Sequence, residues 1–372
     1  MPPINILVKP ASSACNMHCK YCFYEDEAVN RTKGFAGMMS NETAENMIES
    51  AARFASGTCS FMFQGGEPTL AGLDFYRSFL ETEKKYLRDD LTFLHSIQTN
   101  GYALDDEWIN FFKENDFFVG ISLDGYADLH DLNRNGKNTG GSFNRVMRSI
   151  ALLKKYGVRF NVLSVVTSRA ARSAEKNYNF FKKQGLDNLQ FIPCLDPIGE
   201  SSGFSPSAEE YASFLTKTFR LWYADFIGGR AVSIRTFDNW LSILLGGTPE
   251  ACDMCGCCGI QFVVEGDGSV YPCDFYALDE YKIGTVGESS FEEMLASPVA
   301  QRFVEVSLNV PEECRQCRWY PLCRNGCRRE REVLTDGAYG KTRRCAAYKL
   351  FFEENEQLLA RTLHIIKTNC VK

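Results

Sequence analysis

Three cysteines near the N-terminus are spaced as ligands of a metal centre. Cys15, Cys19 and Cys22 form a C-x3-C-x2-C triplet in one short polar loop. Clustered thiols in a chain without a secretory signal indicate metal ligands before disulfides. Three thiolates from one loop can hold three irons of a [4Fe–4S] cube and leave the fourth iron open to a small molecule. Tetrahedral zinc usually takes four protein ligands or includes a histidine, so the triplet favours an iron–sulfur cluster.

A second group of cysteines fills the C-terminal part of the chain. Eight thiols there are enough for two fully ligated [4Fe–4S] clusters; they are Cys252, Cys258, Cys273, Cys314, Cys317, Cys323, Cys327 and Cys345. Cys255 could replace Cys252, and the sequence leaves this choice open. C-x2-C pairs also occur in zinc ribbons, so zinc stays an alternative for this group. Arginines interleave with these cysteines and either offset cluster charge or form a solvated basic face.

Two further elements carry chemistry. Gly65-Gly66-Glu67-Pro68 ends a predicted strand; its glycines allow close backbone approach to a ligand, and Glu67 offers an acceptor for an ammonium group. Asp274 directly follows Cys273 and is flanked by aromatic residues. A partly desolvated carboxylate there would suit a general base; the alternative is a turn residue or a hydrogen-bond acceptor beside the cluster.

Alternating strands and helices must position these residues. Short apolar, β-branched runs between amphipathic segments predict parallel βαβ units, whose strand ends share one face. We expect Gly65, Gly66, Asn100, Asp124 and Cys194 on that face. The expected strands are 4–9, 59–63, 92–98, 117–123, 158–166 and 188–194, with helices over 41–55 (capped by Ser40), 73–88, 106–115, 171–184 and from a Ser142 cap to just before Gly157.

The pattern changes after residue 198. Residues 198–207 are predicted to form a linker and 208–227 a helix. Gly266-Asp267-Gly268 between two apolar runs, 261–265 and 269–273, predicts a hairpin. Helices are expected over 290–297 and, closing the chain, 346–367.

Composition excludes several classes of protein. The 372 residues are 45% hydrophobic and 24% charged, as in a folded protein, and the net charge of −6 provides no positive field for nucleic acid. No apolar run reaches ~18 residues, so no membrane span is expected. The start lacks a basic region followed by an apolar core, and we expect a cytoplasmic protein.

The cysteine triplet, with Tyr21 before its last cysteine, resembles the radical S-adenosylmethionine (SAM) superfamily. The resemblance implies a partial (β/α)6 barrel, in agreement with the strand pattern. It also implies that SAM chelates the open iron and is cleaved to methionine and a 5′-deoxyadenosyl radical. Gly65 to Pro68 matches the element that holds the methionine amino group. By analogy Ser122 and Arg134 contact the SAM carboxylate, and Tyr21, Gly66 and Leu195 pack against SAM.

The C-terminal cysteines resemble the SPASM extension of radical SAM enzymes, whose spacing includes Gly268 between Cys258 and Cys273. The resemblance implies one auxiliary cluster on Cys252, Cys258, Cys273 and Cys327 and another on Cys314, Cys317, Cys323 and Cys345, hence three [4Fe–4S] clusters. The expected domains are a radical SAM barrel over 1–230, a bridge over 231–251, a SPASM domain over 252–348 and a C-terminal helix over 349–372.

Four segments narrow the resemblance to anaerobic sulfatase-maturating enzymes: Lys9–Ser13, Cys22–Tyr24, Phe63–Gly72 and Gln261–Tyr276. That family oxidises a cysteine or serine of an unfolded sulfatase peptide to Cα-formylglycine. The resemblance implies that the radical takes a hydrogen from the target Cβ, that Asp274 is the base and that Tyr24 and Gln64 lie beside the target. It further implies a small redox protein as electron donor, and we expect a monomer.

Rival functions share part of these signals. A SPASM maturase that forms thioether or carbon–carbon crosslinks in a ribosomally made peptide would carry the same cysteines. Many such enzymes have an N-terminal recognition domain, for which a first strand starting at residue 4 leaves no room. An electron carrier would need neither the open triplet nor Gly65 to Pro68, and a zinc-dependent binding module would differ in metal content. The sequence does not distinguish a cysteine from a serine target.

Overall fold

The computed structural model describes residues 2–137, 140–334 and 339–370, without the side chains of residues 369 and 370. The chain divides into two compact units. The first comprises Met1–Leu123, His130–Phe160 and Gly259–Phe303; the second comprises Asp124–Leu129, Asn161–Cys258 and Val304–Lys372. The predicted domains are consecutive stretches of chain, and their boundaries stay a prediction. Among the described residues, no helix has the length and apolar character needed to cross a membrane.

The first unit is built on a mixed sheet with the order β5-β4-β3-β1-β11-β12-β13. Its first four strands in chain order are parallel, and β11 extends them in parallel against β1, so that Leu7 pairs with Met62 on one side and Val263 on the other. The hairpin β11–β12 forms as its glycine turn predicts. The strands are β1 Ile4–Val8, β3 Gly57–Phe63, β4 Leu91–Thr99, β5 Phe118–Ser122, β11 Val263–Val264, β12 Ser269–Tyr271 and β13 Gly284–Thr285.

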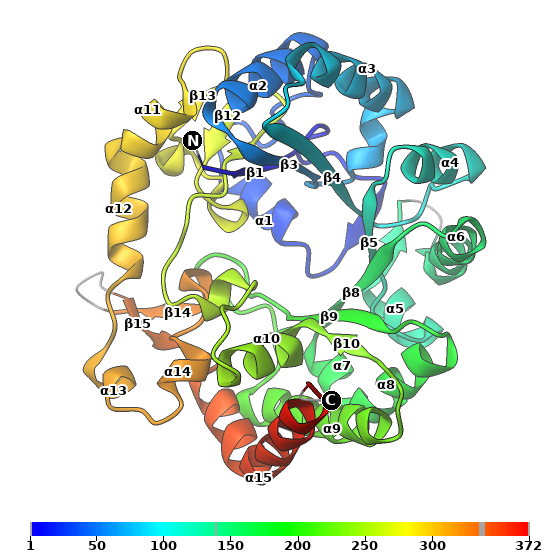
Figure 1. Ribbon diagram of the computed structural model, residues 1–372, viewed down its shortest axis with the longest axis vertical. Helices are drawn as coiled ribbons and strands as arrows, with labels where there is room; N and C mark the ends of the chain where they lie inside the picture. The colour runs from blue at the N-terminus through cyan, green and yellow to red at the C-terminus, as the bar shows by residue number, and fades with distance from the viewer. Residues whose placement is uncertain (1, 138–139, 335–338, 371–372) are drawn as a thin grey trace. The chain divides into compact units, whose positions relative to one another are not determined.

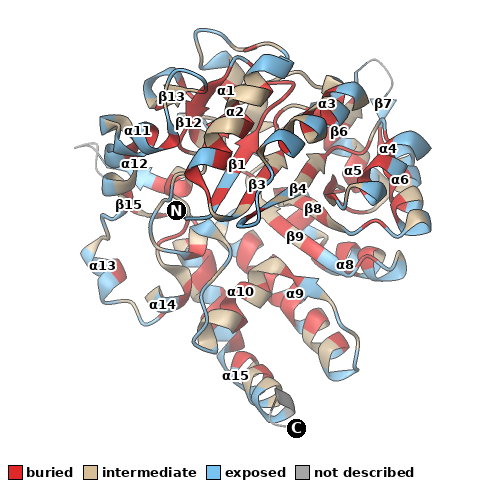
Figure 2. Cartoon of the chain, turned by 45° about the horizontal axis from the view of Figure 1, so that its top comes forward, coloured by how far each residue is buried: buried red, intermediate tan, exposed pale blue. Residues whose placement is uncertain are grey.

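Amphipathic helices cover one face of these parallel strands, with α2 and α3 lying along β1, β3 and β4 (Figure 1). Their apolar sides enter an aromatic core in which the ring of Phe79 contacts those of Phe61 and Phe63 at 5.0 and 5.1 Å between centroids. Figure 2 shows the outward sides of these helices as exposed. The predicted Ser40 cap is present, since its side chain accepts from the Thr43 backbone N–H. The helices are α2 Asn41–Phe54, α3 Leu73–Glu83, α4 Asp106–Glu114, α6 Phe143–Tyr156, α11 Phe291–Ala296 and α12 Pro298–Ser307.

The second unit contains three parallel strands and a set of helices. Its helices α9 and α15 lie side by side (Figure 1), and the rings of Phe219 and Phe351 join them at 5.6 Å. Trp240 of α10 packs on Phe351 and Phe352 at 4.9 Å from each ring. The elements are β8 Phe160–Val166, α7 Ser168–Arg172, α8 Ala174–Lys183, β9 Asn188–Pro193, α9 Ala208–Ile227, β10 Ser233–Ile234, α10 Arg235–Leu244, α13 Glu312–Arg315, α14 Tyr320–Cys323, β14 Arg331–Val333, β15 Tyr339–Thr342 and α15 Cys345–Cys370.

The structure differs from the predicted elements in several places. The expected loop 10–37 contains a short strand, β2 Met17–Cys19, and a helix, α1 Phe23–Val29; a further helix, α5 Ala127–Asn133, was not expected. The helix expected over 73–88 ends at Glu83 and continues as a 3-10 turn, Lys84–Tyr86. The helix expected over 171–184 is divided at Ser173, whose backbone leaves the helical region.

The predicted cap at Ser142 is wrong. The hydroxyl of Ser142 does not cap α6 but donates to the carbonyl oxygen of Arg134 at 2.9 Å, while Asp131 accepts the backbone N–H groups of Ser142 and Phe143 at 2.8 Å each. An aspartate from the preceding helix therefore accepts the free backbone N–H groups at the N-terminus of α6. The residues adjacent to Ser142 in sequence do not indicate this contact. The same bonds fix the strand β6 Arg134–Gly136, which pairs with β7 Gly140–Gly141.

Candidate active site and cysteine groups

The N-terminal cysteine loop runs between β1 and α1 in the first unit. All three of its cysteines are free thiols of intermediate exposure. Cys22 is the N-cap residue of α1; burial raises the pKa of its thiol, and the backbone N–H groups of Glu25 and Tyr24 offset part of that effect. The strand β2 carries Cys19 and pairs with β6, which sets Cys19 opposite Arg134. Pairing of two short strands thus holds a cation beside the loop.

Hydrogen bonds reach the sulfur of Cys15 from two sides. The backbone N–H of Met17 donates to this sulfur at 3.4 Å, and the side-chain amide of Asn100, after β4, donates at 3.6 Å. Burial raises the pKa of Cys15 to about 11. A ligand must be deprotonated when metal binds, and donors on a cluster sulfur stabilise its negative charge. The loop therefore fits a three-thiolate iron–sulfur cluster in its donor set and in its surroundings.

The glycine-rich element packs directly on the cysteine loop. The backbone N–H of Gly66 donates to the carbonyl oxygen of Ser12 at 2.9 Å, and that of Glu67 donates to the carbonyl oxygen of Ala14 at 2.8 Å. A Cβ atom on Gly66 would lie 2.1 Å from the Ala14 oxygen, and Gly65 has a φ of +111°. Both positions therefore need glycine for contact between two loops of the chain, in addition to any approach to a ligand.

Glu67 is fully buried, and its carboxylate accepts hydrogen bonds from the chain itself. One oxygen accepts from the Thr69 N–H and hydroxyl at 3.1 and 2.6 Å and from the Thr99 hydroxyl at 2.8 Å; the other accepts from the Asn100 N–H at 2.7 Å. Burial raises the pKa of Glu67, and these bonds offset part of the increase. Three of these donors act on one oxygen and one acts on the other, so the carboxylate braces the ends of β3 and β4 while the second oxygen keeps acceptor capacity. The predicted contact of Glu67 with an ammonium group stays a prediction.

The other predicted SAM contacts divide between the two units. The guanidinium of Arg134 lies over the Tyr21 ring at 5.4 Å, and Ser122, at the end of β5, accepts from the side-chain amide of Gln98 at 3.2 Å. Leu195 belongs to the second unit, where it lines a polar cavity together with Asp196 and Arg329. Tyr21, Gly66, Ser122 and Arg134 thus share the unit of the cysteine loop, and the direct contacts of all five residues with SAM stay a prediction.

The structure brings Asp274, Tyr24 and Gln64 together. The Tyr24 hydroxyl donates to Asp274 Oδ2 at 2.7 Å. Gln64 Nε2 donates to the same oxygen at 3.1 Å and to the Tyr24 hydroxyl at 2.7 Å. Asp274 is 6% exposed and begins a 3-10 turn directly after Cys273. A buried carboxylate held by two neutral donors therefore lies at the end of β3 and beside α1, built from residues separated by up to 250 positions. The roles that the resemblance implies for these three residues stay a prediction.

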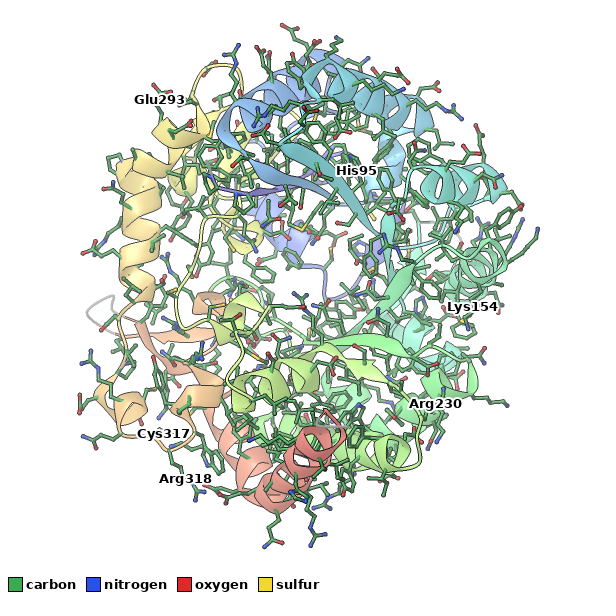
Figure 3. All side chains as sticks on the ribbon, viewed as in Figure 1. His95, Lys154, Arg230, Glu293, Cys317 and Arg318 are labelled. Carbon is green, nitrogen blue, oxygen red and sulfur yellow. The ribbon has the colours of Figure 1, made fainter. Side chains whose placement is uncertain are left out.

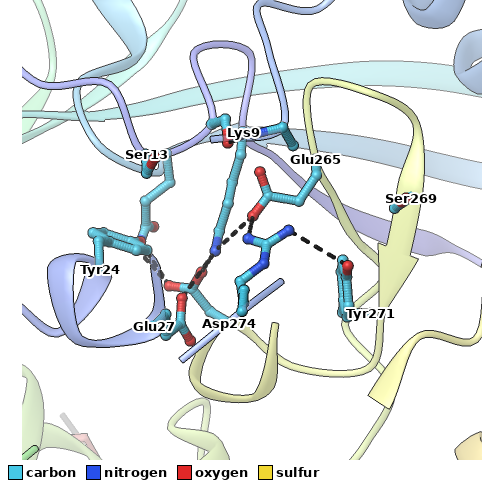
Figure 4. Close-up of polar contacts among 12 residues, drawn as sticks. Lys9, Ser13, Tyr24, Glu27, Glu265, Ser269, Tyr271 and Asp274 are labelled. Carbon is cyan, nitrogen blue, oxygen red and sulfur yellow. Dashed lines mark hydrogen bonds and ion pairs between the residues drawn. The ribbon is translucent and has the colours of Figure 1, made fainter. Parts of the chain in front are cut away.

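Four charged residues around Asp274 were not predicted. The Lys9 ammonium lies 3.2 Å from Asp274 Oδ1, 3.3 Å from Glu27 and 3.5 Å from Glu265, and Arg31 donates to Glu265 at 2.6 Å. Figure 4 shows the side chains of Glu27, Asp274 and Glu265 converging on Lys9. Burial lowers the pKa of Lys9, but the three carboxylates raise it by more, so the pKa lies above its ordinary value. The sequence signal that could have identified Lys9 is its place directly after a buried strand, at the C-terminal end of that strand, where the site residues lie.

The cysteines assigned to the second auxiliary cluster face one pocket of the second unit. Cys314, Cys317, Cys323 and Cys345 line it together with Trp319 and Tyr348. Burial and the three neighbouring thiols raise the pKa of Cys323 to about 12. Cys317, labelled in Figure 3, lies between α13 and α14. Four converging thiols without a disulfide are the donor set of a fully ligated [4Fe–4S] cluster.

Asn325 joins this pocket to β15. Its side-chain oxygen accepts from the Thr342 N–H at 2.8 Å, its amide donates to the Gly340 oxygen at 3.2 Å, and the Cys314 thiol lies 3.9 Å from that side-chain oxygen. Asn325 has a φ of +67°, in the left-handed region that asparagine tolerates. The side chain of Asn325 therefore fixes the position of the cysteine segment relative to β15, the strand that leads to Cys345.

The cysteines assigned to the first auxiliary cluster divide between the units: Cys273 belongs to the first, and Cys252, Cys258 and Cys327 belong to the second. Burial and nearby acidic groups, the Cys258 thiol among them, raise the pKa of Cys252 to about 11, whereas Cys257 is the neighbouring thiol that acts on Cys255. The choice between Cys252 and Cys255 as the partner of Cys258 stays a prediction. Arg328 and Arg331 lower the pKa of Cys258 against the larger effect of burial.

The interleaved arginines differ in burial and in partners, and their effect on a cluster stays a prediction. Arg328 is buried and acts on Cys258, whereas Arg318 is largely exposed and pairs with Glu356. Among the described residues, no three His, Cys, Asp or Glu side chains are arranged around one metal ion. A [4Fe–4S] cube binds each thiolate to a different iron, so its ligands stand farther apart than those of a single ion.

Comparison with known proteins identifies the family. Residues 10–168 match the Radical SAM superfamily, and residues 252–318 match the SPASM iron–sulfur cluster-binding domain. A cysteine-type anaerobic sulfatase-maturating enzyme of Clostridium novyi (strain NT) is 48% identical over 371 residues, covering 99% of this chain and 98% of that protein. A serine-type enzyme of Bacteroides thetaiotaomicron is 33% identical and covers 94% of this chain and 89% of its own.

A solved structure described as native anSMEcpe with bound AdoMet and Cp18Cys peptide is 43% identical and matches with a TM-score of 0.93, covering 98% of this chain and 100% of its own. These matches confirm the predicted fold class, a radical SAM α/β domain followed by a SPASM domain. Because identity of 48% extends over nearly the whole of both chains, this protein belongs to the anaerobic sulfatase-maturating enzymes of the radical SAM superfamily.

Proposed function

We propose that this protein oxidises a cysteine side chain of an unfolded sulfatase peptide to Cα-formylglycine, with release of 5′-deoxyadenosine and methionine. The observation that carries the proposal is the buried Asp274 carboxylate held by Tyr24 and Gln64 in the same unit as the cysteine triplet. A cysteine target is favoured over serine by the higher identity to the cysteine-type relative, 48% against 33%.

The cysteine triplet would hold the cluster that binds SAM. Cys15, Cys19 and Cys22 supply its three thiolates, and Gly66, Ser122, Arg134, Tyr21 and Leu195 are the proposed contacts of SAM. When bound, the cluster and SAM would together supply the radical chemistry that removes a hydrogen atom from the target Cβ. Glu67 is the proposed acceptor for the SAM ammonium group, and its carboxylate also braces the loop on which the triplet rests.

Asp274 is the proposed base for the target thiol. Tyr24 and Gln64 both donate to its Oδ2, and among the residues that the structure describes Oδ1 has only the ion-pair contact with Lys9. Oδ1 is therefore the oxygen that would receive the proton. Donors on Oδ2 hold the carboxylate plane fixed, and burial excludes bulk water that would compete for the thiol. Tyr24 and Gln64 would line the place of the target side chain.

The eight C-terminal cysteines would hold two further [4Fe–4S] clusters, which would accept one electron from the substrate during its oxidation. With the N-terminal cluster, the protein would hold three clusters. A small redox protein would donate the electron for the first cluster. The substrate would enter as an extended peptide, for which backbone contacts give affinity without much sequence dependence, and the enzyme would work as a cytoplasmic monomer.

The test is anaerobic turnover of a peptide that carries Cys-x-Pro-x-Arg with SAM and dithionite, followed by mass spectrometry. Loss of about 18 Da from the peptide, because one oxygen replaces sulfur and two hydrogens, in step with 5′-deoxyadenosine, is the expected result. A matched serine peptide tests the choice of target. Production of 5′-deoxyadenosine with both peptides unchanged would refute the proposed substrate and favour a peptide-crosslinking enzyme.

A further inference from the structure

Lys9 lies at the centre of a buried group of carboxylates. It follows β1 directly, it is 2% exposed, and its ammonium lies within 3.5 Å of Asp274, Glu27 and Glu265. Its stem passes along the glycine-rich element, since a Cβ on Gly65 would be 3.2 Å from both Cβ and Cγ of Lys9. The ammonium also lies 4.8 Å from the centre of the Tyr24 ring. One side chain thus joins the end of β1 to three acidic residues from other segments.

The charges around Lys9 divide between two cations. Arg31 is bound to Glu265 at 2.6 Å and approaches the Tyr271 hydroxyl at 3.4 Å, so Glu265 has a cation of its own. Glu27 and Asp274 depend on Lys9, at 3.3 and 3.2 Å. Two carboxylates this close in a buried site repel each other strongly unless a cation separates them. Lys9 is therefore the group that allows Asp274 to face Glu27 as a carboxylate.

The contacts of Asp274 explain why Lys9 matters for geometry as well as for charge. Tyr24 and Gln64 act on Oδ2, and Lys9 acts on Oδ1 from the end of β1. Forces on both oxygens fix the rotation of the carboxylate about its bond to Cβ. Without the ammonium, Oδ1 would turn away from Glu27 and the oxygen proposed to receive the proton would lose its orientation.

We propose that Lys9, held between Glu27 and Asp274, is a positioning residue that orients Asp274 Oδ1 toward the target side chain. The proposal rests on the proposed function and adds to it a residue that acts through the base. Lys9 neither touches the substrate nor changes its own protonation, so its removal should slow the oxidation of the peptide and leave the cleavage of SAM intact.

The test compares Lys9→Met with the wild-type holoenzyme. Methionine keeps the stem length and removes the charge. We expect kcat for formylglycine to fall by about 10²-fold, as misplacement by about 1 Å can cause, with KM for the peptide changed less than about twofold. The amount of 5′-deoxyadenosine formed per formylglycine should rise accordingly, which a general loss of folded enzyme would not produce. Lys182→Met, which breaks the ion pair with Asp225 in the second unit, is the matched control and should keep the wild-type ratio.

A second variant tests the proposal if Lys9→Met alone does not fold. Lys9→Met combined with Glu27→Gln removes one positive and one negative charge, so it restores the balance but not the contact with Asp274. We expect a folded enzyme with the same low kcat and the same raised ratio. Wild-type kcat in either folded variant, or loss of the thermal transition in the double variant as well, would overturn the proposal. A wild-type enzyme that makes no formylglycine would instead refute the proposed function.

Discussion

Substitution of Gly66 by alanine tests whether the two site loops must touch. An added Cβ would lie 2.1 Å from the Ala14 oxygen, 2.6 Å from the Ala14 carbonyl carbon and 2.7 Å from that of Ser13, all of them backbone atoms. Side-chain rotation cannot relieve such a clash. Because contacts under 3.0 Å are essentially never tolerated, the loops must separate by at least 3.0 − 2.1 = 0.9 Å.

The magnitude follows from what this separation breaks. The hydrogen bonds from Gly66 to Ser12 and from Glu67 to Ala14, at 2.9 and 2.8 Å, would lengthen; each contributes about 0.5–1.5 kcal/mol. Overpacking adds about 1–3 kcal/mol. The cysteine loop of Gly66→Ala should therefore be destabilised locally by about 2–6 kcal/mol, and a displacement near 1 Å should slow cleavage of SAM by about 10²-fold.

The assay measures iron and sulfide per chain, the electron paramagnetic resonance spectrum of the reduced enzyme with and without SAM, and the rate of 5′-deoxyadenosine release. We expect a lower iron content, a weakened spectral change on addition of SAM and a slow release. Gly228→Ala is the control, since its Cβ would meet nothing closer than 3.2 Å. Wild-type iron content and release rate in Gly66→Ala would refute the argument that the loops are held by this contact.

Three other substitutions separate the parts of the site. Asp274→Asn keeps the shape but removes the proton acceptor, so formylglycine formation should fall by about 10²–10⁴-fold, or about 3–5 kcal/mol; liquid chromatography should find SAM cleavage retained, and a full formylglycine rate would refute the role of base. Glu27→Gln should flatten the pH dependence of stability. Burial raises the pKa of Glu27 from 4.5 to about 7 despite Lys9, so the folded wild type binds a proton more readily than the unfolded chain. The free energy of unfolding of the wild type should therefore decrease by up to about 3 kcal/mol as the pH rises from ~5 to ~8. Urea unfolding at both pH values should show this decrease in the wild type and not in Glu27→Gln. An equal change of unfolding free energy with pH in the two proteins would contradict the prediction. Asn100→Ala removes a donor to the Cys15 sulfur and should lower the potential of the first cluster by about 20–60 mV; a redox titration that finds no shift would show that the bond is too weak to matter.

Features that repeat along the chain were predictable from the sequence. The strands β1, β3, β4, β5, β8 and β9 follow short apolar runs, and the hairpin β11–β12 follows its glycine turn, because local backbone preferences decide these elements. The cysteine groups were recognisable since ligands of a cluster must be close in space and most of these are close in sequence. Both Ser40 and Ser142 were predicted as caps from their positions. The Ser40 side chain does cap its helix, whereas the Ser142 side chain does not, because Asp131 of another helix accepts the backbone N–H groups there.

Contacts between distant segments were not predictable from one sequence. Arg134 lies beside Cys19 only because β2 and β6 pair, and each of these strands has three residues, too few to carry an alternating pattern. In the sequence, Lys9 has the pattern of a polar residue at the end of a strand. Its sequence neighbours do not indicate that Glu27 and Glu265 surround it. Glu27 likewise resembles any acidic residue of an exposed helix until α1 is packed against the sheet.

Glu67 shows that a residue predicted to bind a ligand can also have a structural role in the site. Its place after two glycines at a strand end marks it as part of the site, and an acid beside a proposed ammonium ligand invites a direct contact. Burial of a carboxylate is costly unless donors replace water, and here Thr69, Thr99 and Asn100 supply them. Asn100 in turn donates to the Cys15 sulfur. The charge of Glu67 is therefore used to fix the backbone of Asn100, and through it the surroundings of a cluster ligand, so this acid acts on the site by holding the ends of two strands in register with the cysteine loop.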